Sequence, residues 1–281
     1  MKIDILGVKV DKIRQEEVIR RVEKWLLEKE SQHYIVTPNP EMVVAAQQDK
    51  KFKNILNKAD IAIPDGIGLL WAAKFLSLEI RYQTLVRNLR IFWQFIYTQL
   101  SLIFHPKYCR TVLPERVTGT DLVWKIAQLC EQKNCSIYLL GAIGNISQLA
   151  SKKLKQRFPN LKIAGAFAGS PKPEADEKSR AIINHAQPDI LFVAYGHQKQ
   201  EKWIDRNLPK LNSVKLAIGV GGAFDFIAEK TKRAPQFFRK LGLEWFWRLI
   251  TQPWRIKRIW TATFIFPWKV LKYKINKSKY D

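Results

Sequence analysis

The chain has 281 residues, of which 47% are hydrophobic and 26% charged, a composition that excludes wholesale disorder and allows one large domain with an appendage. Lys and Arg exceed Asp and Glu by 23, which predicts an anionic partner: a nucleic acid, a phosphorylated substrate or an acidic membrane. The three cysteines are too few for a disulfide framework and lack the neighbours that would complete a metal site.

The N-terminal segment lacks the pattern of a secretory signal, because Asp4, Lys9 and Asp11 interrupt its apolar residues. The longest apolar run, 91–104, is shorter than the roughly 18 residues of a membrane-spanning helix and contains polar side chains. We therefore expect a cytoplasmic protein that touches a membrane without crossing it.

Short β-branched runs alternate with amphipathic helices along most of the chain. Val18, Val22 and Leu26 recur at helical spacing, and the following run 33–37 predicts a strand that Pro38 ends. Further strands are predicted at 59–63, 136–140, 161–165, 189–194 and 214–219. Helices are predicted around 122–130, up to 158, from 174 and from 198. Strands separated by single helices are typical of a mostly parallel sheet covered on both faces, so the sequence predicts a Rossmann-like α/β fold.

Two segments interrupt this alternation. Residues 81–110 form an aromatic insert without acidic residues, and residues 232–281 carry 13 Lys and Arg against two acids, with five of the ten tryptophans. Basic amphipathic helices with tryptophan are typical of membrane surfaces. We therefore expect a Rossmann-like domain over 1–231, its amphipathic insert at the surface rather than in the core, and a membrane-associating appendage over 232–281.

The residues that follow the predicted strands are small and polar, unlike the strands themselves. Ligands of open parallel sheets bind at the carboxyl ends of the strands, so these loops predict a phosphate-bearing ligand that lies across several of them. The candidate residues are Thr37, Asn39, Asp65, Gly141, Gly144, Tyr195, Gly196, Gln200, Glu201, Gly221 and Asp225. A dinucleotide fingerprint is missing, because Phe224 stands where the third glycine would follow Gly219 and Gly221.

Asp65 lies on a turn between Pro64 and Gly66, at the end of a predicted strand. A carboxylate there could remove a proton from an attacking hydroxyl. It could equally cap the helix that is predicted to begin near Ile67. Position alone does not separate the catalytic role from the capping role.

Other strand-end residues also have two interpretations. Glu201 could hold a ribose hydroxyl or lie in the first turn of a helix, and Asp225 is a rival carboxylate. His197 could act as an acid, although a loop histidine beside a glycine is more often solvated. Gly141 and Gly144 precede a predicted helix, where free N–H groups could hold a diphosphate, or they could form a turn with positive φ.

Three arginines of the basic tail, Arg248, Arg255 and Arg258, fall within roughly 80° of one helix face at about 100° per residue. They could clamp a diphosphate, or they could form a solvated basic face that meets lipid headgroups. Pro253 interrupts this helix and weakens the argument for a single face.

Several of these segments are ordered as in a known family. They are TPNPEM at 37–42, ADIAIPDGIG at 59–68, LPERVTGTD at 113–121, QKQEKW at 198–203, GVGGAFDF at 219–226 and KRAP at 232–235, followed by LGLEW at 241–245. Over nearly its whole length the sequence resembles the WecG/TagA/CpsF glycosyltransferases, family 26.

The resemblance implies an inverting enzyme that transfers a sugar, typically N-acetylmannosamine or a relative, from a UDP donor. The implied acceptor is a polyprenyl-diphosphate-linked sugar at the inner membrane face, in surface polysaccharide or teichoic-acid-type glycan synthesis. Members of the family need no metal, and this sequence has no Asp-x-Asp pair. The insert 81–110 departs from the family pattern and leaves the acceptor and a homo-oligomeric state open.

The resemblance also implies roles for individual residues. Asp65 matches the base of the family, and Thr37 and Asn39 match its pocket residues. The three tail arginines match those of a mobile appendage that completes the site. The other strand-end candidates are then expected to contact the donor.

Two further classes remain as alternatives. A basic nucleic-acid-binding protein would explain the charge and the interleaved aromatic residues, but it would leave the ordered strand-end motifs unexplained, so we expect no nucleic-acid partner. A nucleotide-sugar epimerase or an oxidoreductase on the same fold would need the dinucleotide site that the sequence does not offer.

Overall fold

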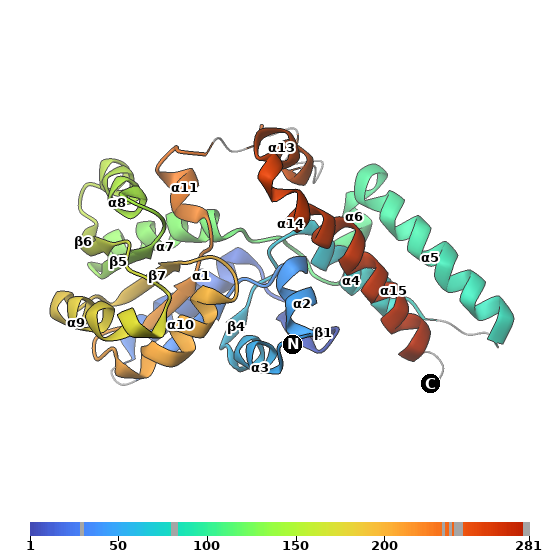
Figure 1. Cartoon of the computed structure of the whole chain (residues 1–281), viewed down its shortest axis with the longest axis horizontal. Helices are drawn as coiled ribbons and strands as arrows, with labels where there is room; N and C mark the ends of the chain where they lie inside the picture. Colours follow the sequence, from blue (N-terminus) through green and yellow to red (C-terminus); the bar gives the residue numbers. More distant parts are fainter. Residues whose placement is uncertain (29–30, 80–83, 232–233, 236–237, 239–243, 278–281) are drawn as a thin grey trace.

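The computed structural model describes the chain except residues 29–30, 80–83, 232–233, 236–237, 239–243 and 278–281, and the side chains at 84–85, 244–245 and 248. Its largest sheet has six parallel strands in the order β4-β3-β8-β7-β5-β6 (Figure 1). These strands are β3 (His33–Val36), β4 (Ile61–Ala62), β5 (Ser136–Gly141), β6 (Lys162–Phe167), β7 (Ile190–Ala194) and β8 (Leu216–Gly219).

Helices cover both faces of this sheet. One face carries α1 (Gln15–Leu27), α7 (Gly119–Lys133), α8 (Ile146–Arg157) and α11 (Ala223–Ile227). The other face carries α9 (Asp176–Ala186) and α10 (Lys199–Asn207). Leu139 belongs to the first cluster and Leu140 to the second, as the two-residue period of a strand requires. The predicted α/β fold with a parallel sheet is therefore confirmed.

A short antiparallel hairpin, β1 (Lys2–Ile5) and β2 (Val8–Asp11), precedes this sheet and was not predicted. Leu6 and Gly7 form its turn with φ of 55° and 79°, the positive values that a tight two-residue hairpin needs. The Asp11 carboxylate accepts the N–H of Ala62 at 2.8 Å, so the hairpin attaches to β4.

The remaining elements lie near β3 and β4 and extend the molecule away from β6 (Figure 1). They include α2 (Pro40–Ala46), α3 (Lys50–Lys58), α4 (Ile67–Ser77), α5 (Thr84–Phe104) and α6 (Pro106–Cys109). The C-terminal segment adds α13 (Glu244–Thr251), η3 (Pro253–Arg255), α14 (Ile256–Trp260), the π-helical η4 (Thr261–Ile265) and α15 (Phe266–Lys277). Two short 3-10 helices also belong to the described chain: η1 (Pro173–Ala175), before α9, and η2 (Leu208–Lys210), after α10.

Helix α5, which makes up most of the insert, has one buried face. Ile91 is fully buried, Phe95 meets Trp71 edge-on with ring centroids 5.6 Å apart, and the Trp71 indole N–H donates to Thr98 Oγ1 at 2.9 Å. The expectation that the insert lies outside the core is therefore wrong for this face, because α4 needs a cover for its large aromatic side chains.

The opposite face of α5 is apolar and exposed. Its exposed side chains are Val86, Leu89, Phe92, Trp93, Tyr97, Leu100, Ile103 and Phe104. Even so, none of the helices in the described part of the chain has the length and apolar character needed to cross a membrane.

Candidate active site

A polar cavity of about 130 Å³ lies where β3, β4, β7 and β8 end. This is the edge at which open parallel sheets bind their ligands. Of the residues proposed from the sequence, it brings together Thr37, Asn39, Asp65, Gly196, Gln200, Gly221, Arg255 and Arg258. Residues far apart in the chain thus converge on one site, as the strand-end argument predicted.

The loop after β4 holds Asp65 at this cavity. The backbone N–H of Asp65 donates to the carbonyl of Pro38 at 2.8 Å, which joins it to the loop after β3. Gly66 has a φ of +113°, and a Cβ on Gly68 would lie only 2.8 Å from Pro40, so glycines allow the two loops to approach closely. Gly66, rather than the half-buried Asp65, occupies the N-cap position of α4.

Thr37 and Asn39 fix the loop after β3. The Thr37 hydroxyl donates to the carbonyl of Gly219 at 3.1 Å and so connects the ends of β3 and β8. The Asn39 side-chain oxygen accepts the N–H of Met42 at 2.9 Å and caps α2. Both residues line the cavity, and both also hold the backbone that shapes it.

The Gln200 side chain holds the loop after β8 by a hydrogen bond. Its side-chain oxygen accepts the N–H of Gly221 at 2.9 Å, and its amide donates to Glu201 Oε1 at 2.7 Å. Glu201 is fully buried, and burial raises the pKa of this carboxyl to about 7. Glu201 lines neither of the cavities around Asp65, whereas Gln200 lines the polar cavity.

Four other candidates also lie outside the lining of the polar cavity: Gly141, Gly144, Tyr195 and Asp225. Tyr195 packs edge-on against Trp203 with ring centroids 6.1 Å apart. Burial raises the pKa of Asp225, and the charge of Arg255 opposes this shift. Gly141 and Gly144 have φ of 108° and 63°, so the turn interpretation of this pair holds, and it follows β5 at the same sheet edge.

The C-terminal segment closes the cavity through Arg258. Its guanidinium donates to Glu41 at 2.6 Å and lies 3.3 Å from His197 Nδ1. Burial, and then the charge of Arg258, lower the pKa of His197. His197 is only partly exposed and lines the cavity, contrary to the expectation of a solvated side chain. The side chain of Arg248, the third arginine of the predicted clamp, lies outside the described residues.

Sequence reasoning missed two parts of this site. Glu41 was visible only as a member of the 37–42 motif, although it anchors Arg258. The N-terminus of α7 was missed as well: Thr118, Gly119 and Thr120 line the cavity, and Thr118 caps this 15-residue helix. A helix start of this length presents N–H groups and positive potential to an anion.

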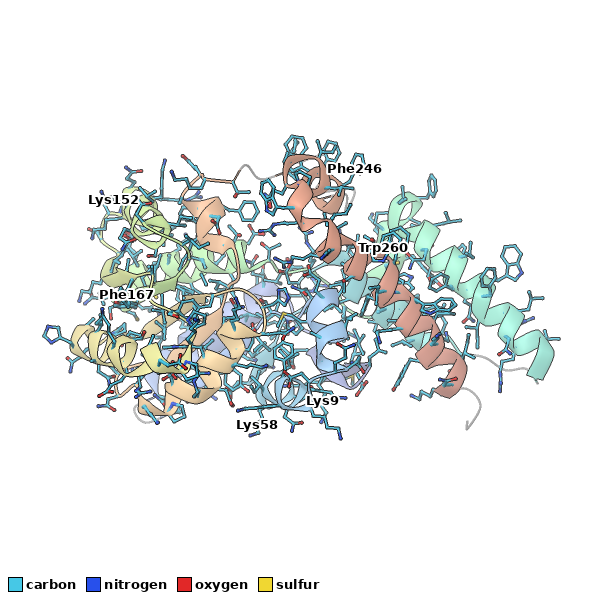
Figure 2. All side chains as sticks on the ribbon, viewed as in Figure 1. Lys9, Lys58, Lys152, Phe167, Phe246 and Trp260 are labelled. Carbon is cyan, nitrogen blue, oxygen red and sulfur yellow. The ribbon has the colours of Figure 1, made fainter. Side chains whose placement is uncertain are left out.

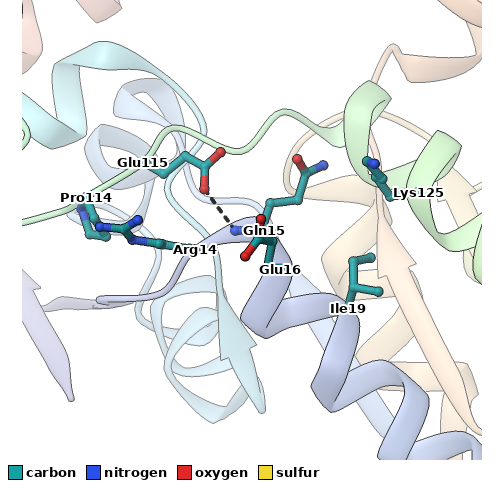
Figure 3. A pocket seen from close by; sticks show the side chains of 7 residues that line it. All are labelled: Arg14, Gln15, Glu16, Ile19, Pro114, Glu115 and Lys125. Atoms are coloured by element: carbon teal, nitrogen blue, oxygen red, sulfur yellow. Dashed lines mark hydrogen bonds between the residues drawn. The ribbon is translucent and has the colours of Figure 1, made fainter.

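An apolar groove of about 450 Å³ adjoins the polar cavity, and both are lined by Asn39, Asp65, Arg255 and Arg258. A third cavity, of about 520 Å³, shares no lining residue with these two and lies between the start of α1 and the segment before α7 (Figure 3). There, Glu115 accepts the N–H of Gln15 at 3.0 Å and thereby caps α1, which gives the Glu of the 113–121 motif a structural role. The described residues contain no group of three His, Cys, Asp or Glu side chains placed to hold a metal.

The candidate site thus combines a carboxylate at the strand ends of a doubly covered parallel sheet with arginines and a helix N-terminus beside it. The chain matches the glycosyl transferase WecG/TagA/CpsF family over residues 3–98 and 100–280, and it belongs to this family. Family membership favours the glycosyltransferase over the nucleic-acid-binding and dinucleotide alternatives.

Relatives in three bacteria carry the same name, N-acetylglucosaminyldiphosphoundecaprenol N-acetyl-beta-D-mannosaminyltransferase. The protein of Bacillus subtilis is 29% identical, with 92% of this chain and 87% of the relative aligned. That of Bacillus spizizenii is 30% identical, with 86% and 80% aligned. That of Staphylococcus aureus is 28% identical, with 99% and 96% aligned.

Proposed function

We propose that this protein transfers N-acetylmannosamine from a UDP donor to a polyprenyl-diphosphate-linked N-acetylglucosamine, with inversion at the donor carbon. The names of the relatives specify this sugar and acceptor. The observation that carries the proposal is Asp65, which lines both the polar cavity and the apolar groove together with Arg255 and Arg258. A base at this junction has a polar site for the donor on one side and a route for a lipid-linked acceptor on the other.

The reaction is a single displacement. The Asp65 carboxylate removes the proton of the acceptor hydroxyl, whose oxygen attacks C1 of the donor sugar while the bond from C1 to the UDP oxygen breaks. Negative charge grows on the departing diphosphate, and Arg255, Arg258 and the N-terminus of α7 supply fixed positive potential for it. Because these groups provide the charge stabilisation, we propose that transfer needs no metal.

The donor lies over Gly196 and Gly221, whose loops have positive φ and bring backbone close to the ligand. Gln200 holds the Gly221 loop in place, and Glu201 in turn holds Gln200. Gly141, Gly144, Tyr195 and Asp225 remain proposed donor contacts from neighbouring positions at the same edge of the sheet.

We also propose that the enzyme binds peripherally to the inner face of the cell membrane, in the synthesis of a surface polysaccharide or a teichoic-acid-type glycan. The support is a stripe of exposed side chains four residues apart, Ile256, Trp260, Phe264 and Trp268, near the exposed face of α5. Trp260, on α14, and Phe246, on α13, are both exposed on the appendage (Figure 2).

The test is to incubate the purified protein with a panel of UDP-sugars and a short-chain lipid-diphosphate N-acetylglucosamine, and to weigh the products. We expect one added N-acetylhexosamine from UDP-N-acetylmannosamine, with equal yield in EDTA, and an inverted anomeric centre by NMR. The absence of transfer from every UDP-sugar would overturn the proposal.

A further inference from the structure

The apolar groove has a mixed lining. The residues that it shares with the polar cavity, Asn39, Asp65, Arg255 and Arg258, are all polar or charged. Its remaining lining includes Glu41 and Arg116 and the apolar side chains of Trp71, Leu102, Ile103, Ile259, Phe264 and Pro267. Its volume of about 450 Å³ lies within the range of small-molecule sites. The groove therefore fits an elongated ligand with an anionic head and an apolar tail.

Two separate elements make the apolar walls. Leu102 and Ile103 come from the last turn of α5, in the insert, and Phe264 comes from η4 on the appendage. Trp71, fully buried on α4, lies between them at the base and is fixed by its hydrogen bond to Thr98. The insert thus supplies one wall of a cavity that reaches Asp65, in addition to covering the core.

Three arginines, Arg116, Arg255 and Arg258, line the groove together with two carboxylates, Glu41 and Asp65. The Glu41 carboxylate accepts from Arg258 at 2.6 Å. Guanidinium groups match the paired oxygens of a diphosphate. Two of the apolar lining residues also belong to the exposed surface, because Ile103 and Phe264 are 49% and 57% exposed.

We infer that this groove holds the first isoprene units of the acceptor, with its diphosphate at Arg116, which lines the groove and not the polar cavity, and its sugar hydroxyl at Asp65. The inference rests on the proposed function for the identity of the head group. It adds that the insert, through Leu102 and Ile103, recognises the lipid part of the substrate. A tail leaving between Ile103 and Phe264 passes directly onto the apolar surface that surrounds the mouth of the groove.

The test measures equilibrium binding of farnesyl diphosphate and of dimethylallyl diphosphate to the full-length protein, without vesicles. The two probes share a diphosphate and differ only in chain length. We expect farnesyl diphosphate to bind at least tenfold more tightly. The double variant Ile103→Gln with Phe264→Gln should remove most of this difference and leave the affinity for dimethylallyl diphosphate unchanged.

A matched control uses neighbouring side chains that do not line the groove. Leu100→Gln with Trp268→Gln changes residues that are 51% and 56% exposed, about as much as the groove pair. This control should keep the wild-type preference for the longer chain. Both double variants should lose vesicle binding to a similar degree, which separates groove binding from general membrane affinity.

Equal affinity of the two diphosphates in the wild-type protein would overturn the inference. An equal loss of the preference for farnesyl diphosphate in both double variants would overturn it as well. The failure of the proposed function looks different: farnesyl diphosphate binds with the expected dependence on the groove, but no UDP-sugar is transferred to any acceptor. If the double variant does not fold by circular dichroism, Ile103→Gln alone, compared with Leu100→Gln, gives the same comparison.

Discussion

At the scale of single residues, the reaction depends on the position of Asp65. We expect Asp65→Asn to reduce kcat by roughly 10²–10⁴, the usual contribution of a positioned base, because an amide cannot accept the proton of the acceptor. The fold and the affinity for UDP should stay unchanged, since Asn has nearly the shape of Asp and keeps the backbone hydrogen bond from residue 65 to Pro38. Steady-state kinetics and calorimetric UDP binding check both statements. Near-normal turnover in the folded variant would remove Asp65 from the mechanism.

Glu201 predicts a pH dependence of stability. Its folded pKa of about 7 lies above the ordinary value of 4.5, because the carboxyl is buried. Between these values the native state binds more protons than the unfolded chain, so the free energy of unfolding falls as pH rises from 4.5 to 7 and stays lower above 7. Glu201→Gln should remove this fall and stabilise the protein at pH 8 by on the order of 1 kcal/mol.

Urea unfolding at pH 5 and pH 8 measures this effect. The exposed Glu177→Gln variant is the control and should keep the wild-type pH dependence. If Glu201→Gln loses stability equally at both pH values, the carboxyl is charged in the native state and the prediction is wrong.

At the scale of elements, η3 and α14 connect the appendage to the site. Arg255→Ala with Arg258→Ala should lower kcat/KM at least 100-fold with a water-soluble acceptor, because both groups line the polar cavity where charge develops on the leaving diphosphate. Binding to anionic vesicles should be largely kept, since the exposed aromatic stripe remains. Lys257→Ala is the control, as Lys257 is exposed between the two arginines and lines neither cavity. Normal transfer by the double variant would show that these arginines contact lipid and do not take part in the reaction.

Helix α15 is attached to α4 and α5 by a buried ammonium group. Lys274 Nζ donates to the carbonyls of Phe75 and Leu78 and to Gln94 Oε1, the last two at 2.9 Å. Burial lowers the pKa of Lys274 from 10.5 to about 8. The unfolded chain therefore binds more protons between pH 8 and 10.5, and the free energy of unfolding rises with pH across this window.

Lys274→Met should remove this rise and lower stability by about 1–3 kcal/mol, because it leaves buried carbonyls without donors. Thermal unfolding at pH 7.5 and pH 10 measures both changes. Lys277→Met, which changes an exposed lysine on the same helix, should leave both unaffected. A stability difference that is the same at both pH values would contradict the assigned titration.

At the scale of the whole molecule, the exposed faces of α5 and of the α14–α15 segment give one end of the protein an apolar, basic surface. Binding to anionic vesicles should gain about 1 kcal/mol for each basic residue near the surface, and salt should screen this part within about 8–10 Å. We expect sedimentation with vesicles to weaken as salt is raised but not to disappear, because tryptophan insertion persists. Complete release at high salt would show that the aromatic residues do not insert.

The sequence by itself determined the sheet and the edge at which the site lies. Strand and helix periods depend on neighbouring residues, and the carboxyl ends of parallel strands must share one edge, so Thr37, Asn39, Asp65 and Gly221 could be grouped without coordinates. The motifs in these loops also sufficed to predict the family.

Only the tertiary structure decided which side chains face the ligand and which support it. Arg258 and Glu41 are separated by 217 positions, and no local pattern relates them. Gln200 lines the polar cavity and the fully buried Glu201 does not, although both belong to the same helix start. Helix α5 divides into a core face and an exposed face because α4 presents Trp71 and Phe75 to it. These outcomes depend on packing between distant segments, whereas sequence periodicity specifies only the face that a helix buries and not the partner that covers it.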